Sequence, residues 1–463
     1  MADCSRNEAP ARASGRLPFL TQSLAAFVVG TRTSNIPEDA LRRARMVVAD
    51  VIACAAVGAD TEIGRIGRAM GRRLWGAGAS AVWQHGADAS VIAAIFANAS
   101  AATALDLDDG HRLACGHPAA GIVPLALALG EREGTPGTDL LAAIAIGYEI
   151  AVRVSASRDI PALDTSASGR WMAYACAATA ARLLRLDEDK TCHALSIAGA
   201  LGPNLLANGW SKEKGNTIKE GIPFAAVTGL MAAEMAAEGA TGPRDALDNP
   251  KLFDREVILP QEPIEWQITR NYFKFYSACR HIHPAIDMAL ALRDEGLQPG
   301  EITAIEIATY RRGLSLNNYP APPNPISAQY SFPYCVGLAL IAGREAVAVI
   351  DDTFLRDEAV VSLARLVTLS QDLGLEAAFP AKTGAVLRVR CGDRVIDRRS
   401  EHCSGDWQMG DCSALVRQKF RDLTRASMSE QCQNATLEAI EALASAEPSR
   451  LSQLLSAPDN APA

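Results

Sequence analysis

Residues 222–239 read IPFAAVTGLMAAEMAAEG, and this stretch decides the fold class that we predict. Pro223 suits the first turn of a helix, and Gly239 suits its end. Between them, small residues such as Gly229 recur where a neighbouring helix needs room to approach closely. The stretch therefore predicts a helix packed tightly inside a helical domain.

The helical pattern extends outward from this stretch over most of residues 18–265. Within residues 36–59, Leu41, Val48 and Val51 recur at helical spacing. Residues 138–154 are apolar on almost every face, which is typical of a buried helix. We therefore expect a mainly α protein whose larger part is an all-α domain.

Towards the C-terminus the pattern changes to alternation. In EITAIEIATY (301–310) and VLRVRCGDRVID (386–397), apolar and charged residues alternate, and the second stretch contains a Gly-Asp turn. These patterns predict strands and a hairpin, and helical sequence returns after residue 408. The expected organisation is a helical domain from both chain ends (17–272 and 408–456), a smaller α+β lid domain (273–407) and disordered ends (1–16 and 457–463).

The composition excludes several function classes. With 463 residues, 49% of them hydrophobic, and a net charge of −8, the chain is expected to be globular and to bind no nucleic acid. No apolar run is long enough for a membrane span. Eleven cysteines without a Cys-x-x-Cys pair suggest reduced thiols, and residues 1–16 lack the apolar core of a secretory leader. A cytoplasmic location is therefore expected.

Titratable residues gather in LDLDDGHRLACGHPAAG (105–121). One interpretation is a helix junction with capping aspartates. The other is one wall of an active site, because His117 stands directly before a proline and close to several charged groups. A metal site is a third alternative, but the histidines, including the pair in His281-x-His283, lack the usual ligand spacing, so we expect no metal.

Three further segments hold candidate binding residues. Basic residues alternate with aromatic ones in 273–290, lysines crowd a polar loop in 208–221, and polar groups punctuate an apolar helix in 327–340. The alternative for segment 273–290 is a solvated basic face, and the alternative for 208–221 is a solvated loop. For 327–340 the alternative is packing in the core. If the substrate is an anion, the net negative charge of the chain means that its attraction must come from a local cationic pocket, and these segments hold candidate cations.

The order and content of these four segments resemble the MmgE/PrpD family. Its members include 2-methylcitrate dehydratases, cis-aconitate decarboxylases and an iminodisuccinate epimerase. The resemblance extends from LAAFVVGTRTSNIPEDALRR to the LVRQKF region and rests most on 105–131, 147–155, 273–289 and 328–340. It implies a helical domain from both chain ends with an α+β lid, a homodimer, and catalysis without a cofactor.

The resemblance also implies residue roles. The catalytic candidates are Asp106, His117, Lys219 and Lys274. Among the candidates for binding the carboxylate substrate, the resemblance implies Tyr334, and the polar clusters of the sequence supply His111, Arg112, Lys214, Arg280, His281, His283 and Ser331. A histidine that titrates near neutrality suits proton transfer, so we assign that role to His117, with Asp106 orienting it or acting as a base.

The chain departs from the decarboxylase pattern at four points. Segment 166–186 lacks a second active-site histidine, and Cys279 stands where the decarboxylases have another. Gly110 replaces a threonine, and Asn216 stands where the decarboxylases place their lysine. These differences weaken the match to decarboxylation but leave lyase chemistry in general.

The function expected from the sequence is therefore a cofactor-independent lyase of the dehydratase type, similar to 2-methylcitrate dehydratase. Decarboxylation of the cis-aconitate type and epimerisation of a related polycarboxylate are the enzymatic alternatives. A carboxylate-binding protein that has lost the chemistry is the alternative from another class.

Overall fold

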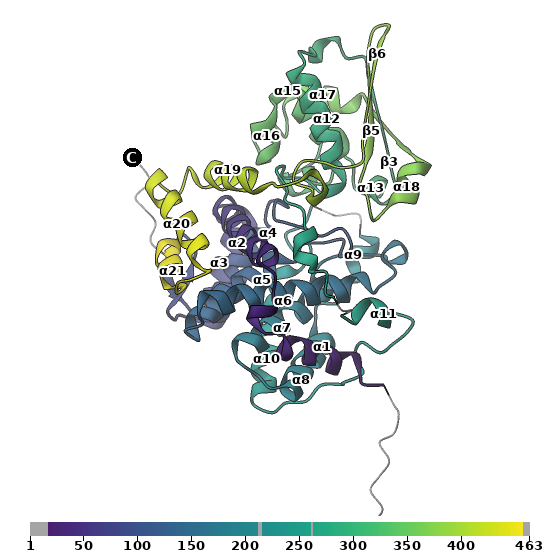
Figure 1. Ribbon diagram of the computed structural model, residues 1–463. Helices are drawn as coiled ribbons and strands as arrows, with labels where there is room; N and C mark the ends of the chain where they lie inside the picture. Colours follow the sequence, from purple (N-terminus) through teal and green to yellow (C-terminus); the bar gives the residue numbers. More distant parts are fainter. Residues whose placement is uncertain (1–16, 212–214, 261–262, 457–463) are drawn as a thin grey trace, which may run out of the picture.

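The computed structural model describes residues 17–211, 215–260 and 263–456, and α-helices dominate it (Figure 1). The mainly α fold class expected from the sequence is confirmed. The predicted disordered ends, residues 1–16 and 457–463, lie outside the described residues.

The larger hydrophobic core joins residues 20–273 to residues 412–455. Its N-terminal helices are α1 (Leu20–Gly30), α2 (Glu38–Gly58), α3 (Glu62–Trp75), α4 (Val91–Thr103), α5 (Ala119–Arg132), α6 (Gly137–Ala156), α7 (Gly169–Leu183), α8 (Glu188–Leu201), α9 (Ala207–Trp210), α10 (Ile222–Ala237) and α11 (Arg255–Ile258). A short antiparallel hairpin of β1 (Ser80–Val82) and β2 (Gly86–Ala89) interrupts this series and was not predicted.

Helix α10 shows why small residues shape this core. It packs against α7 and α8, and a Cβ atom on Gly229 would lie 2.4 Å from Cys176 Cβ and 2.8 Å from the Ala173 carbonyl oxygen. Gly239, with a φ of 93°, follows the end of the helix. The predicted close helix packing in residues 222–239 is therefore confirmed.

The C-terminal helices return to the larger core. They are α19 (Ser413–Thr424), α20 (Glu430–Ala442) and α21 (Ser449–Ser456), drawn in yellow in Figure 1. Helices α19 and α20 pack on α2, and α21 packs on β1. Both ends of the described chain thus contribute to one core.

A second hydrophobic core lies within residues 276–396. Its four-stranded sheet has the order β4 (Val367–Gln371), β3 (Ala304–Thr309), β5 (Ala385–Cys391) and β6 (Arg394–Ser400). Strand β3 runs parallel to β4 and antiparallel to β5, and β5 and β6 form the predicted hairpin. The predicted strands are confirmed, whereas β4 was not predicted.

Helices cover this sheet and complete the second core. They are α12 (His283–Asp294), α13 (Arg311–Leu314), α14 (Pro325–Ala328), α15 (Phe332–Ala342), α16 (Arg344–Ala348), α17 (Glu358–Arg365) and α18 (Leu373–Ala378). Helix α12 contacts β5 and β6, and α15 packs against α12 and α17. The predicted division of the chain into a helical domain and a lid domain stays a prediction.

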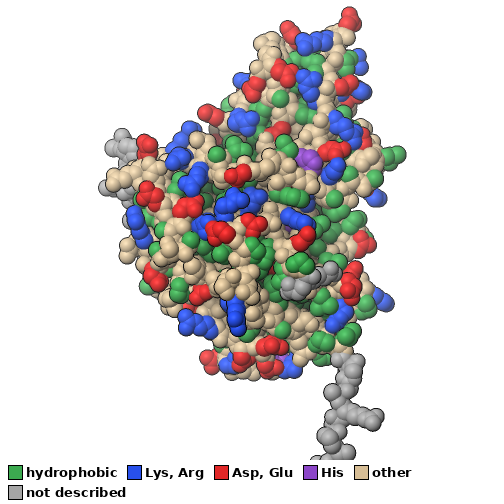
Figure 2. Space-filling view, viewed as in Figure 1, with side chains coloured by type: hydrophobic (Ala, Val, Ile, Leu, Met, Phe, Trp, Pro, Cys, Tyr) green, Lys and Arg blue, Asp and Glu red, His purple; other side chains and the backbone are tan. Residues whose placement is uncertain are grey.

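The surface and the helix lengths bear on possible partners. Figure 2 shows acidic and basic side chains interspersed over the face that it displays. Within the described parts of the chain, no helix combines the length and the apolar character needed to cross a membrane.

The close packing at Gly229 yields a stability prediction. Gly229→Ala places a methyl group against Cys176 and the backbone of α7, so we expect it to lower the free energy of unfolding by ~1–3 kcal/mol. Gly30→Ala is the matched control, since nothing lies within 4 Å of its added Cβ atom. Urea unfolding of both variants measures the difference. Equal stability of the two variants would contradict the close packing.

Candidate active site

The loop between α4 and α5 carries the polar motif. Asp106 has a left-handed φ of 51°, a conformation that costs free energy in a residue with a side chain. Two backbone hydrogen bonds between Gly110 and Tyr272, with N···O distances of 3.0 and 2.8 Å, hold the loop. Asp109 Oδ1 accepts a hydrogen bond from Ala119 N, at 3.1 Å, at the start of α5. Asp109 therefore caps the helix, which leaves Asp106 and His117 for other contacts.

A buried ion pair supports the same loop from behind. Lys419 Nζ, from α19, lies 2.6 Å from Asp50 Oδ1 on α2. The same ammonium donates to the carbonyl oxygen of Leu107 at 2.7 Å. Leu107 stands between Asp106 and Asp108, so helix α19 helps to fix the positions of both carboxylates.

Lys274, from a distant segment, forms a buried chain of ion pairs with two residues of this loop. Lys274 Nζ lies 2.6 Å from Asp106 Oδ1, and His117 Nε2 lies 3.0 Å from the same oxygen. Lys274 is fully buried, and the other two residues expose at most 7% of their surface. Charges buried this deeply are stable only when they are paired, so each member depends on the others.

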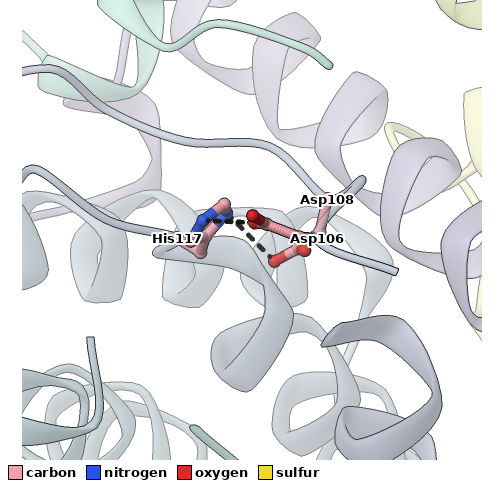
Figure 3. A group of neighbouring side chains, drawn as sticks. All are labelled: Asp106, Asp108 and His117. Carbon is pink, nitrogen blue, oxygen red and sulfur yellow. Dashed lines mark ion pairs between the residues drawn. The ribbon is translucent and has the colours of Figure 1, made fainter. Parts of the chain in front are cut away.

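Both nitrogens of the His117 ring face oxygen acceptors (Figure 3). Nε2 faces Asp106, while Nδ1 lies 2.8 Å from the Asp109 carbonyl oxygen and 3.4 Å from Asp108 Oδ2. Burial disfavours the charged ring, but the two carboxylates outweigh burial and raise the pKa of His117 to about 10. The ring is therefore an imidazolium near neutral pH.

The three aspartates of the loop differ in acidity. Burial favours the neutral form of each, but Lys274 and His117 hold the pKa of Asp106 well below its ordinary value. For Asp108, burial outweighs the attraction of His117, and its pKa is raised. Burial and the nearby Asp50 raise the pKa of Asp109 to about 7. Asp106 is thus the carboxylate held most firmly in its ionised form.

Lys219 adds a second buried ammonium beside this group. Its Nζ donates to the carbonyl oxygens of Thr103 and Ala104, at 2.6 and 3.0 Å, and to Gln329 Oε1 at 3.1 Å. Burial lowers the pKa of Lys219, and the attraction of Asp106, which acts in the opposite direction, offsets only part of this effect. Three neutral acceptors match the three ammonium hydrogens, so the charge is held in place without a carboxylate partner of its own.

Two cavities adjoin these residues. The smaller, of ≈ 80 Å³, is lined on its polar side by Asp106, Asp108 and His117. The larger, of ≈ 560 Å³, lies between the helical part and the α+β part of the chain. Both cavities are lined by Lys219, Glu220 and Tyr330. His117, Lys219 and the carboxylates of Asp106 and Asp108 therefore lie beside cavities in which a small molecule has room to bind.

Comparison with known proteins identifies the relatives of this chain. A family model described as the MmgE/PrpD N-terminal domain matches residues 22–267, and one described as the MmgE/PrpD C-terminal domain matches residues 276–445. The chain belongs to the MmgE/PrpD family. The resemblance seen in the sequence is therefore confirmed.

Curated members of the MmgE/PrpD family show distant similarity. A cis-aconitate decarboxylase of Aspergillus terreus is 25% identical over 388 residues, which are 76% of this chain and 78% of that protein. The cis-aconitate decarboxylase-like protein oryM of Aspergillus oryzae is 28% identical over 246 residues, 51% of this chain. That match spans 49% of oryM, or about half of its length.

In this MmgE/PrpD chain, two arginines predicted to bind substrate are engaged elsewhere. Arg112 donates to Asp406 Oδ1 and to the Ala381 carbonyl oxygen. Arg280 NH2 lies 3.1 Å from Asp406 Oδ2, and its guanidinium lies 4.1 Å from the ring centroid of Tyr272. Neither arginine lines the two cavities. The structure uses them to bind Asp406, which joins the α+β part to the loop of the motif.

Two histidines predicted to bind substrate are also buried away from the cavities. His111 packs edge-on to Tyr148, and burial together with Arg112 lowers its pKa to about 3. His283 Nε2 lies 2.9 Å from the Ala278 carbonyl oxygen, and burial lowers its pKa well below the ordinary value. Both rings are therefore neutral, and neither lines a cavity.

The remaining predicted residues fall into three groups. Ser331 caps α15 by accepting from Tyr334 N at 3.1 Å, and Tyr334 is buried in the second core, so neither lines a cavity. His281 does line the larger cavity. Lys274 holds Asp106 and lines neither cavity, and Lys214 lies outside the described residues.

Several residues of the cavity walls were not predicted from the sequence, among them Asp108, Glu220 and Tyr330. Asp108 belongs to the quoted motif but was assigned no role, although it lies beside His117. Glu220 Oε2 accepts from Ser168 N at 2.9 Å, and Glu220 Oε1 lies 4.0 Å from His117 Nε2. Tyr330 separates the cavities together with Lys219. The position of Glu220 next to Lys219 was the available signal.

Asp106, Asp108 and His117 also place one donor atom each within 4.8 Å of one another, which is a spacing that a metal ion can use. However, the Lys274 ammonium already contacts Asp106, and His117 is itself cationic. A divalent ion at this point would meet two positive charges, so the donor set suits a metal ion poorly.

The raised pKa of His117 predicts how stability depends on pH. Since folding raises this pKa from 6.5 to about 10, the contribution of His117 to stability is complete below about pH 6.5. It is lost as the pH rises towards 10, with each pKa unit corresponding to ~1.4 kcal/mol. We expect His117→Asn to remove this decline in the free energy of unfolding, measured by urea titration at several pH values.

The control for this measurement is His193→Asn. His193 also neighbours a carboxylate, Asp189 at 3.9 Å, but lies outside both cavities. The control should keep the decline of the unmodified protein. If His117→Asn kept it too, His117 would not carry the extra proton.

Proposed function

We propose that this MmgE/PrpD chain is a cofactor-independent lyase that eliminates water from a small hydroxylated di- or tricarboxylate, similar to 2-methylcitrate dehydratase. The observation that carries the proposal is the placement of His117, whose two ring nitrogens face oxygen acceptors and which lines a cavity together with Asp106, Asp108 and Lys219. Elimination of water needs a proton donor for the departing hydroxide, and the imidazolium can supply that proton.

The charges around the site fit the other needs of this reaction. Removal of a proton next to a carboxylate builds enolate-like negative charge, which nearby cations stabilise. Lys219 lines both cavities and can face that charge. In the larger cavity, Arg312 adds a second cation for a carboxylate. Lys274 acts through Asp106, which orients the His117 ring.

Decarboxylation is the second candidate, and it is favoured by the similarity to a cis-aconitate decarboxylase and to a cis-aconitate decarboxylase-like protein. Loss of carbon dioxide needs a proton donor but no departing hydroxide, so the same imidazolium would serve. Against it stand the replacements noted in the sequence, above all Cys279, which lines the larger cavity where the decarboxylases place a histidine.

A panel of substrates separates these activities. Hydroxylated di- and tricarboxylates, beginning with 2-methylcitrate, are followed by the ultraviolet absorbance of the new double bond, by release of carbon dioxide, and by exchange of carbon-bound hydrogen with deuterated water. We expect absorbance without carbon dioxide. Carbon dioxide release would favour decarboxylation, and exchange alone would favour epimerisation. A protein that binds the acids but gives none of the three signals would contradict catalysis.

Substitution of His117 tests its role once the substrate is found. We expect His117→Asn to keep its fold and to lower kcat by ~10²–10⁴-fold, the loss typical of a general acid. His193→Asn is the matched control and should leave kcat unchanged. Steady-state kinetics and thermal melts of both variants give the comparison. Near-normal turnover by His117→Asn would exclude His117 as the proton donor.

We also propose that the protein is a homodimer. Phe224, Met231 and Met235 on α10 are 42%, 43% and 40% exposed, and their spacing places them on one face of the helix. The smaller cavity opens beside this face, where Ile66 and Phe224 form part of its apolar wall. A second copy would cover these apolar side chains and close the cavity.

Light scattering in solution tests the dimer. We expect a mass of roughly twice 49.0 kDa, because an apolar face of this kind is stable in water when it is buried. Met231→Glu should shift the protein towards the monomer, whereas Leu373→Glu, on an exposed leucine of α18, should not. A monomeric unmodified protein at micromolar concentration would contradict the proposal.

A further inference from the structure

Asp108 is buried to 1% exposure, yet one of its oxygens is left without a hydrogen-bond donor. Its Oδ2 atom has no hydrogen-bond partner among the described residues, and its nearest charged neighbour is His117 Nδ1 at 3.4 Å. Buried polar atoms in folded proteins are nearly always hydrogen-bonded, because an unpaired one costs free energy. The side chain also lines the smaller cavity, so the unpaired atom calls for a functional explanation.

Of the other two carboxylates of the loop, Asp109 is engaged through both oxygens, and Asp106 is held ionised by Lys274 and His117, which makes it a weak base. Asp106 Oδ1 contacts Lys274 and His117. Asp109 accepts from Ala119 N and, through Oδ2, from the Tyr148 hydroxyl and the Asn271 amide at 2.8 and 3.1 Å. Among the described residues, Asp108 is therefore the carboxylate of this loop with the fewest polar contacts, and its Oδ2 has the 3.4 Å ion pair with His117 but no hydrogen bond.

The remaining groups of the small cavity are poorly suited to accept a proton from carbon. His117 faces acceptors through both ring nitrogens and has no free lone pair. Lys219 directs its ammonium hydrogens at three acceptors. Glu220 is the rival, but its Oε2 already accepts from the Ser168 amide and hydroxyl.

We propose that Asp108 is the base that removes a proton from the carbon next to a substrate carboxylate. This assignment rests on the proposed dehydratase function. Burial raises the pKa of Asp108 against the pull of His117, which makes the carboxylate a stronger base than an exposed aspartate. His117 and Asp108 then divide the two proton transfers between them, one as acid and one as base.

The elimination step balances with these two residues. Asp108 takes the proton from carbon, the electron pair of the C–H bond forms the second bond of the alkene, and the C–O bond breaks. The departing hydroxide takes a proton from the His117 imidazolium and leaves as water. The step ends with neutral Asp108 and neutral His117, and a net transfer of one proton from Asp108 to His117 through solvent restores the starting state.

The test compares Asp108→Asn with Glu220→Gln, using 2-methylcitrate first and then the other acids of the panel. Asparagine has the shape of aspartate but cannot take the proton. We expect Asp108→Asn to lower kcat by ~10²–10⁴-fold and to abolish exchange of the carbon-bound hydrogen with deuterated water. KM should change much less than kcat. Asp411→Asn, which changes an exposed aspartate paired with Arg42, is the control for a harmless substitution.

Thermal melts show whether each variant is folded before its kinetics are compared. A folded Asp108→Asn protein that still exchanges the hydrogen at the normal rate would overturn the assignment. Loss of exchange in Glu220→Gln alone would assign the base to Glu220 instead. An unmodified protein that turns over no acid of the panel would overturn the proposed function itself, and this assignment with it. If Asp108→Asn does not fold, the assignment is tested with Asp108→Ser, which must also abolish exchange.

Discussion

The contact of Lys274 with Asp106, and of Asp106 with His117, is the interaction on which the site depends. Lys274 stands at the junction of the two hydrophobic cores, between Phe273 of the first and Tyr276 of the second. Its ammonium holds Asp106 ionised, and Asp106 in turn helps to hold the His117 ring charged. Removal of one member would leave a buried charge unpaired, which typically costs several kcal/mol.

Close helix packing makes this arrangement rigid. Glycines such as Gly229 bring the helices of the larger core into backbone contact, and the C-terminal helix α19 reaches the motif loop through Lys419. On the opposite side, Asp406 binds Arg112 and Arg280 and joins the α+β part to the same loop. The catalytic groups we propose are thus held by segments from most of the chain, which limits their motion in the way that proton transfer requires.

Local patterns in the sequence were sufficient for much of the fold. The small residues of 222–239 predicted a packed helix, and the alternation of Ile305 and Ile307 with Glu306 predicted β3. Strand β4 was missed although VTLSQ alternates apolar and polar residues, because the strand is short and lies at the sheet edge, where none of its residues is fully buried. Periodicity reports which face of an element is buried, and it is uninformative where little of the element is buried.

The site could be predicted only in part. The motif and the family resemblance pointed to Asp106, His117 and Lys219, and all three line the smaller cavity, while their catalytic roles stay a prediction. Arg112 and Arg280 were expected to face substrate, but both bind Asp406, a residue far along the chain that no local pattern connects to them. In the same way, the protonation of His117 depends on which oxygens the fold places around it, and not on its neighbours in sequence.

The charge on His117 can be observed directly. The chain has seven histidines, so ¹⁵N-labelled histidine gives a spectrum simple enough to assign with the His117→Asn variant. At a pH between the ordinary histidine value of 6.5 and the value of about 10 expected here, both ring nitrogens of His117 should carry hydrogen. A neutral ring with one bare nitrogen in that range would contradict the account.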